Sequence, residues 1–482
     1  MYYAYKVCEN LTCDVLVVGG GPSGLTAAVQ AAELGLKTII IEGTPAFGGN
    51  GPNTEGVFGV DSDMQKAQGL TIDMCQIIDS ECKTFNYNID PLKWKDLIDN
   101  SGDNINWLQA HGVGFSGIID ECKGYARGMK PFHWFRKRES DGRGDGNLLV
   151  DPLIESAKKL GVTMLTCTRG KELITADGRV CGIYAENTET KDIIKIGSGA
   201  VILATGGFAD NDEMMADRGF NVECVYHRGN PGHNGDGIRM AVEVGAADMS
   251  RMRTYLDKLY IYPLGPYSST TVYVGMKGLT MWTNENGERF VDENCGEVDS
   301  CFCGTAVRTQ KHVFTLFDSA FVEAYKDSAN ELQADIQTLI KADLGNCFTA
   351  ETIEELAEKA GMDKSTLCAN VDRYNEMCNR GEDVDFAKEA SKLIPKKTAP
   401  YYLIRLDMGI WTSLGGLHTN RKFEVLTPME ERIPGLYCVG VDGCELYRDC
   451  YTHTVPGSAN GNNINSGRTA SLAASEYIKS LQ

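Results

Sequence analysis

The sequence lacks an excess of basic charge, and this excludes one large class of partners. Of its 482 residues, 47 are lysine or arginine and 66 are aspartate or glutamate, so the formal net charge is −19. A surface of this sign repels the phosphate backbone of DNA and RNA at long range. We therefore expect no nucleic-acid partner.

Long apolar runs are also missing. No uninterrupted apolar stretch approaches the ~18–20 residues with which a helix crosses a bilayer. The first residues, MYYAYKVCENLTCD, show no basic region followed by an apolar one, so they do not resemble a secretory signal. We predict no membrane insertion and a soluble, cytoplasmic protein.

Paired cysteine motifs are absent, although cysteine itself is abundant. The 17 cysteines run from Cys8 to Cys450, and no two have the CxxC spacing of zinc sites, haem attachment, iron–sulfur ligation or redox dithiols. Cys301 and Cys303 are the closest pair, without third and fourth ligands nearby. We expect no metal, and so many thiols favour the reducing cytoplasm of an anaerobic bacterium.

Proline is scarce, with 14 residues, whereas glycine is frequent, with 53. Hydrophobic residues make up 42% and charged residues 23% of the chain, which is the composition of a globular protein and excludes a disordered one. At roughly 150 residues per domain, the length allows two or three domains.

The first 42 residues contain a strand, a glycine turn, a helix and a second strand in order. DVLVV is followed by GGGPSG, by the helical pattern LTAAVQAAELGLK and by TIIIE, which ends at Glu42. Gly19, Gly21 and Gly24 fit GxGxxG. These glycines let a dinucleotide pyrophosphate approach backbone N–H groups at a helix N-terminus, and the acid accepts hydrogen bonds from ribose hydroxyls. The pattern predicts a dinucleotide-binding α/β domain and does not distinguish FAD from NAD.

The rest of the chain continues this domain around an insertion. Residues 148–160 predict a helix, and the strands that follow include a tight turn at Asp177. VILATGGF predicts another buried strand and glycine turn. Residues 257–406 differ, with tyrosine-rich strands and helical stretches, and they indicate an inserted domain. The strand GLYCVGVD and a final helix over 458–478 then complete the first domain.

Together these segments resemble the FAD-dependent flavoprotein superfamily that includes soluble fumarate reductase, the succinate dehydrogenase flavoprotein, urocanate reductase and 3-ketosteroid dehydrogenase. Among these the chain is most similar in kind to soluble bacterial reductases without a haem domain. The resemblance covers nearly the whole chain. Its segments are VVGGGPSGLTAA, IEGTPAFGGN, GDGNLLVDPLIESAKKLGV, DGRVCGIYAEN, VILATGGFADN, NGDGIRMAVEVGA, NENGERFVDE, SLGGLHTN, IPGLYCVGVD and SGRTA.

The resemblance implies a doubly wound, Rossmann-type FAD-binding domain over 1–258 and 412–482, with an inserted α+β capping or substrate domain over 259–411. Covalently flavinylated relatives carry a histidine in the segment that reads GGNGPNTEGVFG here, so FAD is expected to bind non-covalently. The resemblance places the following residues at FAD: Gly19, Gly21, Pro22, Ser23, Gly24, Glu42, Gly43, Gly48, Gly49, Asn50, Gly51, Ala204, Thr205, Gly206, Gly207, Asp236, Gly415, Gly416, Asp442, Asn460, Asn462, Asn463 and Ile464.

The sequence departs from fumarate reductases where those enzymes bind their dicarboxylate. Their substrate arginines and histidines fall in register with Glu297, Met276, Tyr262 and about Thr412, and their last arginine has no counterpart in GSANGNN. Tyrosines and other aromatic residues are frequent around these positions. Such a lining suits a flat, weakly charged enone-like or aromatic substrate, and it argues against fumarate or succinate.

The expected reaction is the two-electron reduction of an activated C=C bond. Hydride from flavin N5 reaches the β-carbon, and a side chain protonates the α-carbon. The candidate catalytic residues are Tyr262, Arg448, Tyr451 and His453. Arg448 or a tyrosine hydroxyl would stabilise the developing oxyanion, and Tyr451 or His453 would give the proton. Each of these residues also has a plain structural interpretation, in strand packing, hydrogen bonding or ion pairing.

Three alternatives stay open from the sequence. The substrate could be an unsaturated carboxylate similar to urocanate or cinnamate, the chain could be the electron-transfer subunit of a larger complex, or catalysis could run in the oxidising direction. A second GxGxxG and a haem or FMN domain are absent. The electron donor would therefore be NAD(P)H, a reduced flavin, ferredoxin or another electron-transfer protein.

Overall fold

A computed structural model describes residues 5–139, 143–250, 254–264, 268, 270–327, 332–448 and 450–482. The chain divides into two compact units, which we call the main unit and the inserted unit. The main unit comprises Met1–Arg218, Gly229–Leu256 and Trp411–Gln482, and the inserted unit comprises Gly219–Arg228 and Asp257–Ile410. The sequence interpretation placed the insertion at 259–411 and did not include Gly219–Arg228.

The main unit is built on a parallel sheet. Its strand order is β16-β17-β9-β1-β2-β6, and the β7–β8 hairpin extends from β9. Adjacent strands from β17 to β6 are parallel, and the apolar run at the end of β1 is fully buried, as expected for a central parallel strand. The strands are β1 (Val7–Val18), β2 (Thr38–Ile41), β6 (Thr163–Leu165), β7 (Thr168–Ala176), β8 (Arg179–Asn187), β9 (Ile193–Leu203), β16 (Glu424–Leu426) and β17 (Arg432–Cys438).

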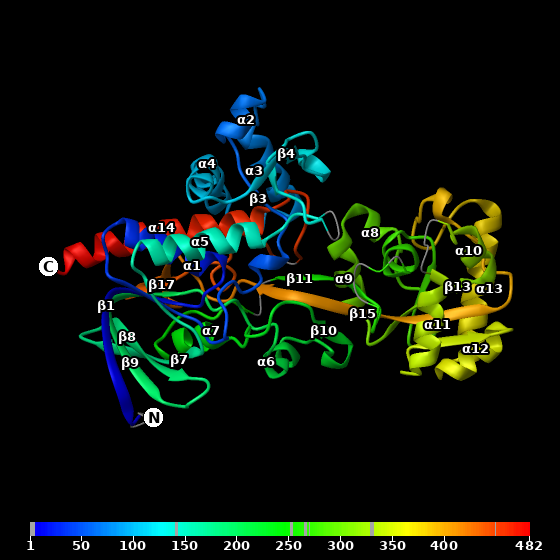
Figure 1. The fold of residues 1–482 in the computed structure, drawn as a ribbon. Coiled ribbons are helices and arrows are strands. Elements are labelled where there is room, and N and C mark those ends of the chain that lie inside the picture. The colour runs from blue at the N-terminus through cyan, green and yellow to red at the C-terminus, as the bar shows by residue number, and fades with distance from the viewer. Residues whose placement is uncertain are drawn as a thin grey trace. The chain divides into compact units, whose positions relative to one another are not determined.

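Three helices of the main unit form a layer beside this sheet (Figure 1). α1 (Pro22–Glu33) packs against both α5 (Asn147–Lys159) and α14 (Ser458–Ser480). The contact with α14 is close, because a Cβ added to Gly467 would lie 2.6 Å from the carbonyl oxygen of Ser23. Alanines of α1, together with Leu25 and Val29, and apolar residues of the other two helices join β1 and β9 in one core.

The remaining elements of the main unit surround this arrangement. A small sheet has the order β3-β5-β4, and α7 packs against β7. The elements are β3 (Gly56–Phe58), α2 (Asp63–Ala67), α3 (Met74–Thr84), α4 (Pro91–Ala110), β4 (Phe115–Asp120), β5 (Phe132–Phe135), α6 (Asp212–Asp217) and α7 (Asp236–Glu243).

The inserted unit has its own sheet and its own core. The order is β10-β15-β13-β12, and β11 and β14 also pair with β15. Apolar side chains of β12, β13 and β15 pack against α12 and α13. The elements that lie wholly or mostly in this unit are β10 (Val225–His227), β11 (Thr254–Tyr260), β12 (Met281–Asn284), α8 (Cys295–Val298), α9 (Ser300–Arg308), β13 (Val313–Asp318), α10 (Ser319–Ala324), α11 (Leu332–Ala342), β14 (Cys347–Ala350), α12 (Ile353–Ala360), α13 (Lys364–Arg380) and β15 (Tyr401–Leu414).

The parallel sheet and the separate mixed unit confirm the predicted fold class. Two local differences have a physical cause in strand pairing. β1 begins at Val7 instead of residue 14, because its first half pairs with β9. Gly219–Arg228 joins the inserted unit because β10 pairs with β15, with Tyr226 opposite Gly409. In the part of the chain that the structure describes, each helix is too short or too polar to cross a membrane.

Candidate functional site

The glycine turn lies between β1 and α1, and its three motif glycines meet different surroundings. A Cβ on Gly19, whose φ is +110°, would lie 2.1 Å from the carbonyl oxygen of Ala204, and a Cβ on Gly24 would lie 2.0 Å from that of Gly19. Both glycines therefore serve chain packing. A Cβ on Gly21 would meet no atom within 4 Å. The space above Gly21 is open, as a bound phosphate group requires.

The helix that follows is suited to an anion. α1 begins at Pro22, directly after Gly21, and no side chain caps it. Its first backbone N–H groups and the positive end of its dipole are thus available at the glycine turn. This is the arrangement that holds a dinucleotide pyrophosphate, so the residues present fit the FAD that the sequence predicts.

Glu42 fixes the loop beside this turn. Its carboxylate accepts the backbone N–H of Gly20 and that of Thr44, each at 2.8 Å. Gly48 donates its N–H to the carbonyl oxygen of Gly20 at 2.8 Å, and a Cβ on Gly49 would lie 3.1 Å from the Cα atom of Gly21. The segment after β2 therefore folds back over the glycine turn.

Asp442 joins three loops of the main unit. Its buried carboxylate accepts the N–H and hydroxyl of Thr205 at 2.6 and 2.8 Å, and the N–H groups of Gly206 and Gly207 at 3.2 and 2.6 Å. Burial raises the pKa of Asp442, and these hydrogen bonds act in the opposite direction. Its carbonyl oxygen accepts the N–H of Leu417, beside Gly416. Asp442 thus holds the loops in place, and its contact with FAD stays a prediction.

The N-terminus of α14 is a second uncapped helix start. Gly457 precedes it with φ +75° and makes no side-chain cap. Asn460 donates to the carbonyl oxygen of Gly56 at 3.0 Å, and Ser458 contacts the Tyr447 hydroxyl at 2.7 Å. The first turn is therefore anchored at two points, while its backbone N–H groups favour nearby negative charge.

Asp236 differs from the other predicted FAD contacts, because its carboxylate is engaged by arginines. It accepts from Arg169 at 2.6 and 2.9 Å and from Arg239 at 3.2 Å. The other predicted FAD contacts border the loops already described. Pro22 and Ser23 begin α1, and Gly43 follows Glu42. Asn50 donates to the carbonyl oxygen of Trp411, and Gly51 packs against Val150 and Pro22. Gly415 donates to the carbonyl oxygen of Val441, and Asn462, Asn463 and Ile464 lie in the first two turns of α14.

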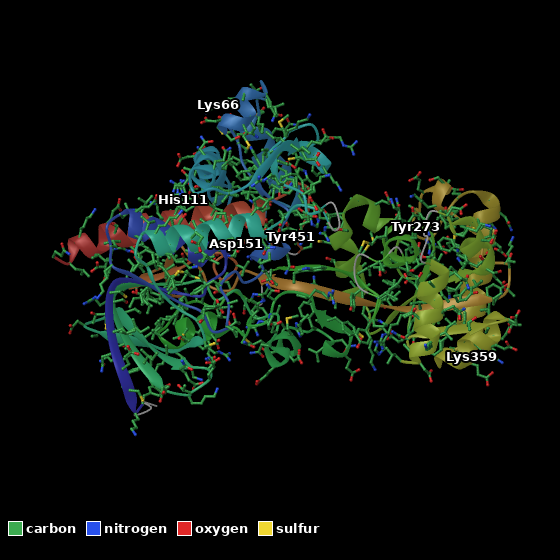
Figure 2. All side chains as sticks on the ribbon, viewed as in Figure 1. Lys66, His111, Asp151, Tyr273, Lys359 and Tyr451 are labelled. Atoms are coloured by element: carbon green, nitrogen blue, oxygen red, sulfur yellow. The ribbon has the colours of Figure 1, made fainter. Side chains whose placement is uncertain are left out.

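Two of the predicted catalytic residues meet in the main unit. The ring of Tyr451, labelled in Figure 2, lies 5.0 Å from the imidazole of His453 and 5.0 Å from the ring of Tyr447, edge to face in both cases. Tyr451 is buried. Arg448 instead lines a cavity of about 780 Å³ together with His418 and Glu445. The structure therefore groups Tyr451 with His453.

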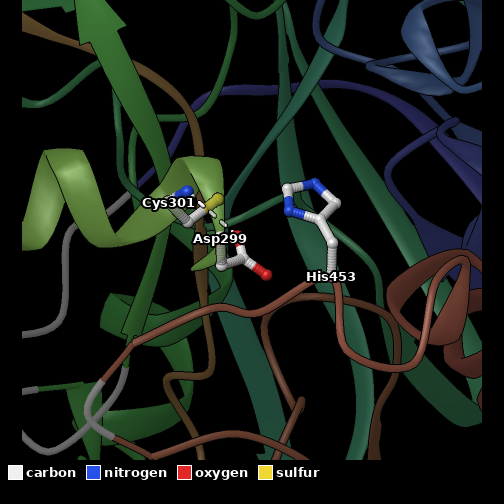
Figure 3. A group of neighbouring side chains, drawn as sticks. All are labelled: Asp299, Cys301 and His453. Atoms are coloured by element: carbon white, nitrogen blue, oxygen red, sulfur yellow. Dashed lines mark hydrogen bonds between the residues drawn. The ribbon is translucent and has the colours of Figure 1, made fainter. Parts of the chain in front are cut away.

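The two cysteines that are closest in sequence lie on α9 of the inserted unit. Asp299 caps this helix, and its carboxylate accepts the N–H of Cys301 at 3.0 Å. Figure 3 shows this hydrogen bond as a dashed line. Cys303 contacts Cys295 instead of Cys301, with 3.9 Å between the sulfur atoms. All 17 cysteines lie in described parts of the chain, and they form no disulfide there.

The fourth predicted catalytic residue, Tyr262, belongs to an aromatic face of the inserted unit. We use this term for Tyr226, Tyr260 and Tyr262. The rings of Tyr226 and Tyr262 stack at 4.7 Å with 10° between their planes, and Tyr260 lies 5.0 Å from Tyr226. Arg228 donates to the Tyr260 hydroxyl at 3.2 Å, with its guanidinium 4.9 Å from the ring centroid. Tyr262 is 38% exposed, Tyr226 is half-buried and Tyr260 is buried, so a ligand can reach this face at Tyr262 and at the edge of Tyr226.

Sequence reasoning named Tyr262 of this face and missed the residues beside it. Tyr226 and Arg228 are two residues apart in CVYHRGN, and so are Arg405 and Asp407 in YYLIRLDMGIW. Polar residues two positions apart, in the second case inside an apolar strand, were the available signal. The two pairs of residues come together only because β10 and β15 are adjacent in the folded sheet.

Comparison with known proteins identifies the family of this chain. A family model described as FAD binding domain matches residues 14–454. The chain is 31% identical to a vinyl phenol reductase of Lactiplantibacillus plantarum, covering 96% of each protein. It is 29% identical to a fumarate reductase (cytochrome) of Shewanella frigidimarina, covering 97% of this chain and 78% of that protein.

The comparison with solved structures shows a shared fold. The structure of a 3-ketosteroid-Δ4-(5α)-dehydrogenase from Rhodococcus jostii RHA1 matches with a TM-score of 0.71 over 98% of each chain, at 24% identity. The glycine turn, the uncapped helices and the match over 14–454 lead to one assignment. The chain belongs to the FAD-binding domain family and is a flavin-dependent oxidoreductase with FAD as its cofactor.

Proposed function

We propose that this enzyme reduces an activated C=C bond in a flat, weakly charged substrate that carries a phenolic or enone oxygen. The aromatic face of the inserted unit carries the proposal. Three tyrosine rings within about 6 Å of one another form a surface on which a planar molecule can stack. The similarity to a vinyl phenol reductase supports a small planar substrate.

The main unit would hold FAD non-covalently. Gly21 and the start of α1 would bind its pyrophosphate, Glu42 its ribose, and the start of α14 would stabilise negative charge on the flavin. When bound, FAD supplies a hydride for transfer to a carbon–carbon double bond. We infer non-covalent binding because the segment over 48–59 contains no histidine.

The proton would come from a side chain near the substrate. Tyr262 presents its ring on the aromatic face, and its backbone is fixed by Asn346, which donates to its carbonyl oxygen at 2.7 Å. Tyr451 and His453 form the pair described in the main unit. We propose Tyr262 or the Tyr451–His453 pair as the acid, and Arg448 as a donor to the substrate oxygen.

The test is an anaerobic reoxidation experiment on the purified flavoprotein. The flavin is reduced by light, and its absorbance is followed after mixing with 4-vinylphenol, a cyclic enone, cinnamate, urocanate or fumarate. Rapid reoxidation by 4-vinylphenol or the enone, with slow reoxidation by fumarate, is expected. Fastest reoxidation by fumarate, or none by any acceptor, would contradict the proposal.

A second function is favoured by one observation. Arg228 is an exposed guanidinium at the edge of the aromatic face, and such a group binds a carboxylate in a bidentate way. A reductase of an unsaturated aromatic carboxylate would use it. Exchange of Arg228 for glutamine would then abolish reoxidation by cinnamate and urocanate and leave that by 4-vinylphenol nearly unchanged.

The electron donor and the location complete the proposal. NAD(P)H, a reduced flavin or an electron-transfer protein would reduce the enzyme. We propose a reducing cytoplasm, which is consistent with 17 cysteines that form no disulfide. Anaerobic mixing of the oxidised enzyme with NADH, NADPH, reduced FMN or reduced ferredoxin identifies the donor by the rate of flavin bleaching.

A further inference from the structure

An ion pair with a buried carboxylate and a half-buried guanidinium lies against the aromatic face. Arg405 and Asp407 are two residues apart on β15, so their side chains leave the same face of the strand. Arg405 Nε lies 2.9 Å from the carboxylate of Asp407, which is fully buried. A buried charge is costly unless it is paired. The surrounding strand is apolar, so core packing alone gives no reason for two charges here.

The arginine of this ion pair is hydrogen-bonded to one tyrosine of the aromatic face. Arg405 donates from Nη2 to the hydroxyl oxygen of Tyr226 at 3.3 Å. A tyrosine hydroxyl that accepts a hydrogen bond keeps its own O–H to donate. Among the described residues, the Tyr226 O–H has no acceptor. Tyr226 is half-buried and stacks on the exposed ring of Tyr262, so its donor is free for a molecule bound at the aromatic face.

The strand register makes room for this arrangement. β10 runs parallel to β15 and places Tyr226 opposite Gly409. A Cβ on Gly409 would lie 3.0 Å from the side chain of Arg228 and 3.6 Å from Tyr260. A larger residue at 409 would therefore crowd the side chain of Arg228, whereas its contact with Tyr260 would be an ordinary one. The glycine leaves room for Arg228 over β15.

Titratable groups from several elements surround Asp407. Arg405 shares its strand, Cys224 precedes β10, Tyr226 lies on β10, Tyr260 ends β11, and His312 precedes β13, 3.1 Å from the Cys224 sulfur. Burial raises the pKa of Asp407 to about 6, against the effect of Arg405 and a hydrogen bond with Cys224. Asp407 is therefore neutral in acid and charged at neutral pH.

The charge of Asp407 acts on Tyr226 through Arg405. Burial and the Asp407 carboxylate raise the pKa of the Tyr226 phenol, whereas Arg405 lowers it. When Asp407 is neutral, the positive charge of Arg405 is not offset and makes the Tyr226 O–H a stronger donor. When Asp407 is charged, that donor weakens.

We propose that Tyr226 binds the phenolic or enone oxygen of the substrate by donating its O–H, and that Arg405 and Asp407 are positioning residues that orient this donor and set its strength. This inference rests on the proposed function and adds Tyr226 to Arg448 as a donor to the substrate oxygen. An enone oxygen gains negative charge when hydride reaches the β-carbon. The oxygen of a 4-vinylphenol gains it when loss of the phenolic proton and protonation of the terminal carbon have given a quinone methide and hydride then reaches the benzylic carbon. In both cases a fixed donor stabilises the transition state more than the ground state.

Exchange of Tyr226 for phenylalanine tests the donor. Y226F keeps the ring and its stacking and removes the hydroxyl. We expect the single-turnover reoxidation rate with 4-vinylphenol to fall by about 10²-fold, in the range of one oxyanion donor. The binding of 4-ethylphenol to the oxidised holoenzyme, followed by the flavin spectrum, is expected to weaken to that of ethylbenzene, which lacks the hydroxyl.

The matched control is Y325F, which removes a hydroxyl elsewhere in the same unit, where Tyr325 packs against Phe321 and Tyr273. It should behave as the wild type. A Y226F enzyme that still prefers 4-ethylphenol as strongly as the wild type would overturn the inference. A wild type that reduces neither 4-vinylphenol nor an enone would overturn the proposed function, and the inference with it.

A pH profile tests the role of Asp407. We expect the single-turnover rate of the wild type to fall as pH rises through about 6, because the carboxylate then offsets Arg405. D407N should keep the low-pH rate across this range, and D407E should restore the inflection. Persistence of the same inflection in D407N, or its absence from the wild type, would show that Asp407 does not tune this donor.

Discussion

At the residue scale, Gly21 separates a ligand requirement from a folding requirement. Its neighbours Gly19 and Gly24 would place a Cβ against backbone atoms, whereas Gly21 has open space. We expect G21A to fold with unchanged thermal stability without FAD and to bind FAD at least about tenfold more weakly, a loss near 1.4 kcal/mol, because the methyl group occupies the pyrophosphate position. Flavin fluorescence titration of apoprotein measures this.

The control for G21A is G197A on β9. A Cβ at Gly197 would make only ordinary contacts, the nearest at 3.8 Å, so this variant adds a methyl group away from the glycine turn. Its FAD affinity should equal that of the wild type. Equal affinities of G21A and G197A for FAD would remove the glycine turn from the cofactor site.

At the element scale, a buried ionic network holds two loops of the inserted unit. Arg289 contacts Glu293 at 2.7 and 2.8 Å and Asp383 at 2.7 Å, and Lys388 lies 3.1 Å from Glu293. Removing one partner leaves a buried charge without compensation. We expect E293Q to lower the free energy of unfolding by about 3–5 kcal/mol, measured by urea denaturation followed by tryptophan fluorescence.

The same network predicts an acid-sensitive stability. Burial raises the pKa of Asp383, but hydrogen bonds from Arg289 and from backbone N–H groups outweigh it and lower the value to about 2. A carboxyl with a lowered folded-state pKa stabilises above its unfolded pKa, near 4, and loses this contribution as pH falls to 2. The difference in melting temperature between wild type and D383N should therefore shrink over this window.

The control for D383N is D372N, at an exposed position on α13. Its melting temperature should follow the wild type from pH 5 to pH 2. A wild type–D383N difference that stays constant over the same range would show that the ion pair does not couple to the proton.

At the scale of the whole molecule, the distribution of thiols gives a simple test of burial. Cys8 and Cys75 are exposed, whereas the other 15 cysteines are buried or intermediate. Burial raises the pKa of several of them, for example that of Cys13 to about 12, so their thiolate fraction is very small. We expect a disulfide reagent to label about two thiols rapidly in the native protein and all 17 in denaturant without reductant. Fewer than 17 in denaturant would reveal disulfides.

Sites formed by residues close together in the chain could be predicted from the sequence, whereas sites formed by residues far apart in the chain could not. The glycine turn and Glu42 lie within one strand–helix–strand unit, so spacing alone located them. Tyr226 and Asp407 are far apart in the chain and meet only because β10 pairs with β15. The spacing of two between Tyr226 and Arg228 and between Arg405 and Asp407 was visible in the sequence. The sequence did not show which strand pairs with which.

The sequence by itself determined the fold class, the family and the FAD-binding segments, because these depend on short-range patterns of apolar residues, glycines and one acid. Only the tertiary structure decided that Gly219–Arg228 belongs to the inserted unit, and that Arg405 and Asp407 lie beneath a tyrosine face. The physical reason is that strand pairing and burial decide which distant side chains touch, and burial also sets the pKa of Asp407.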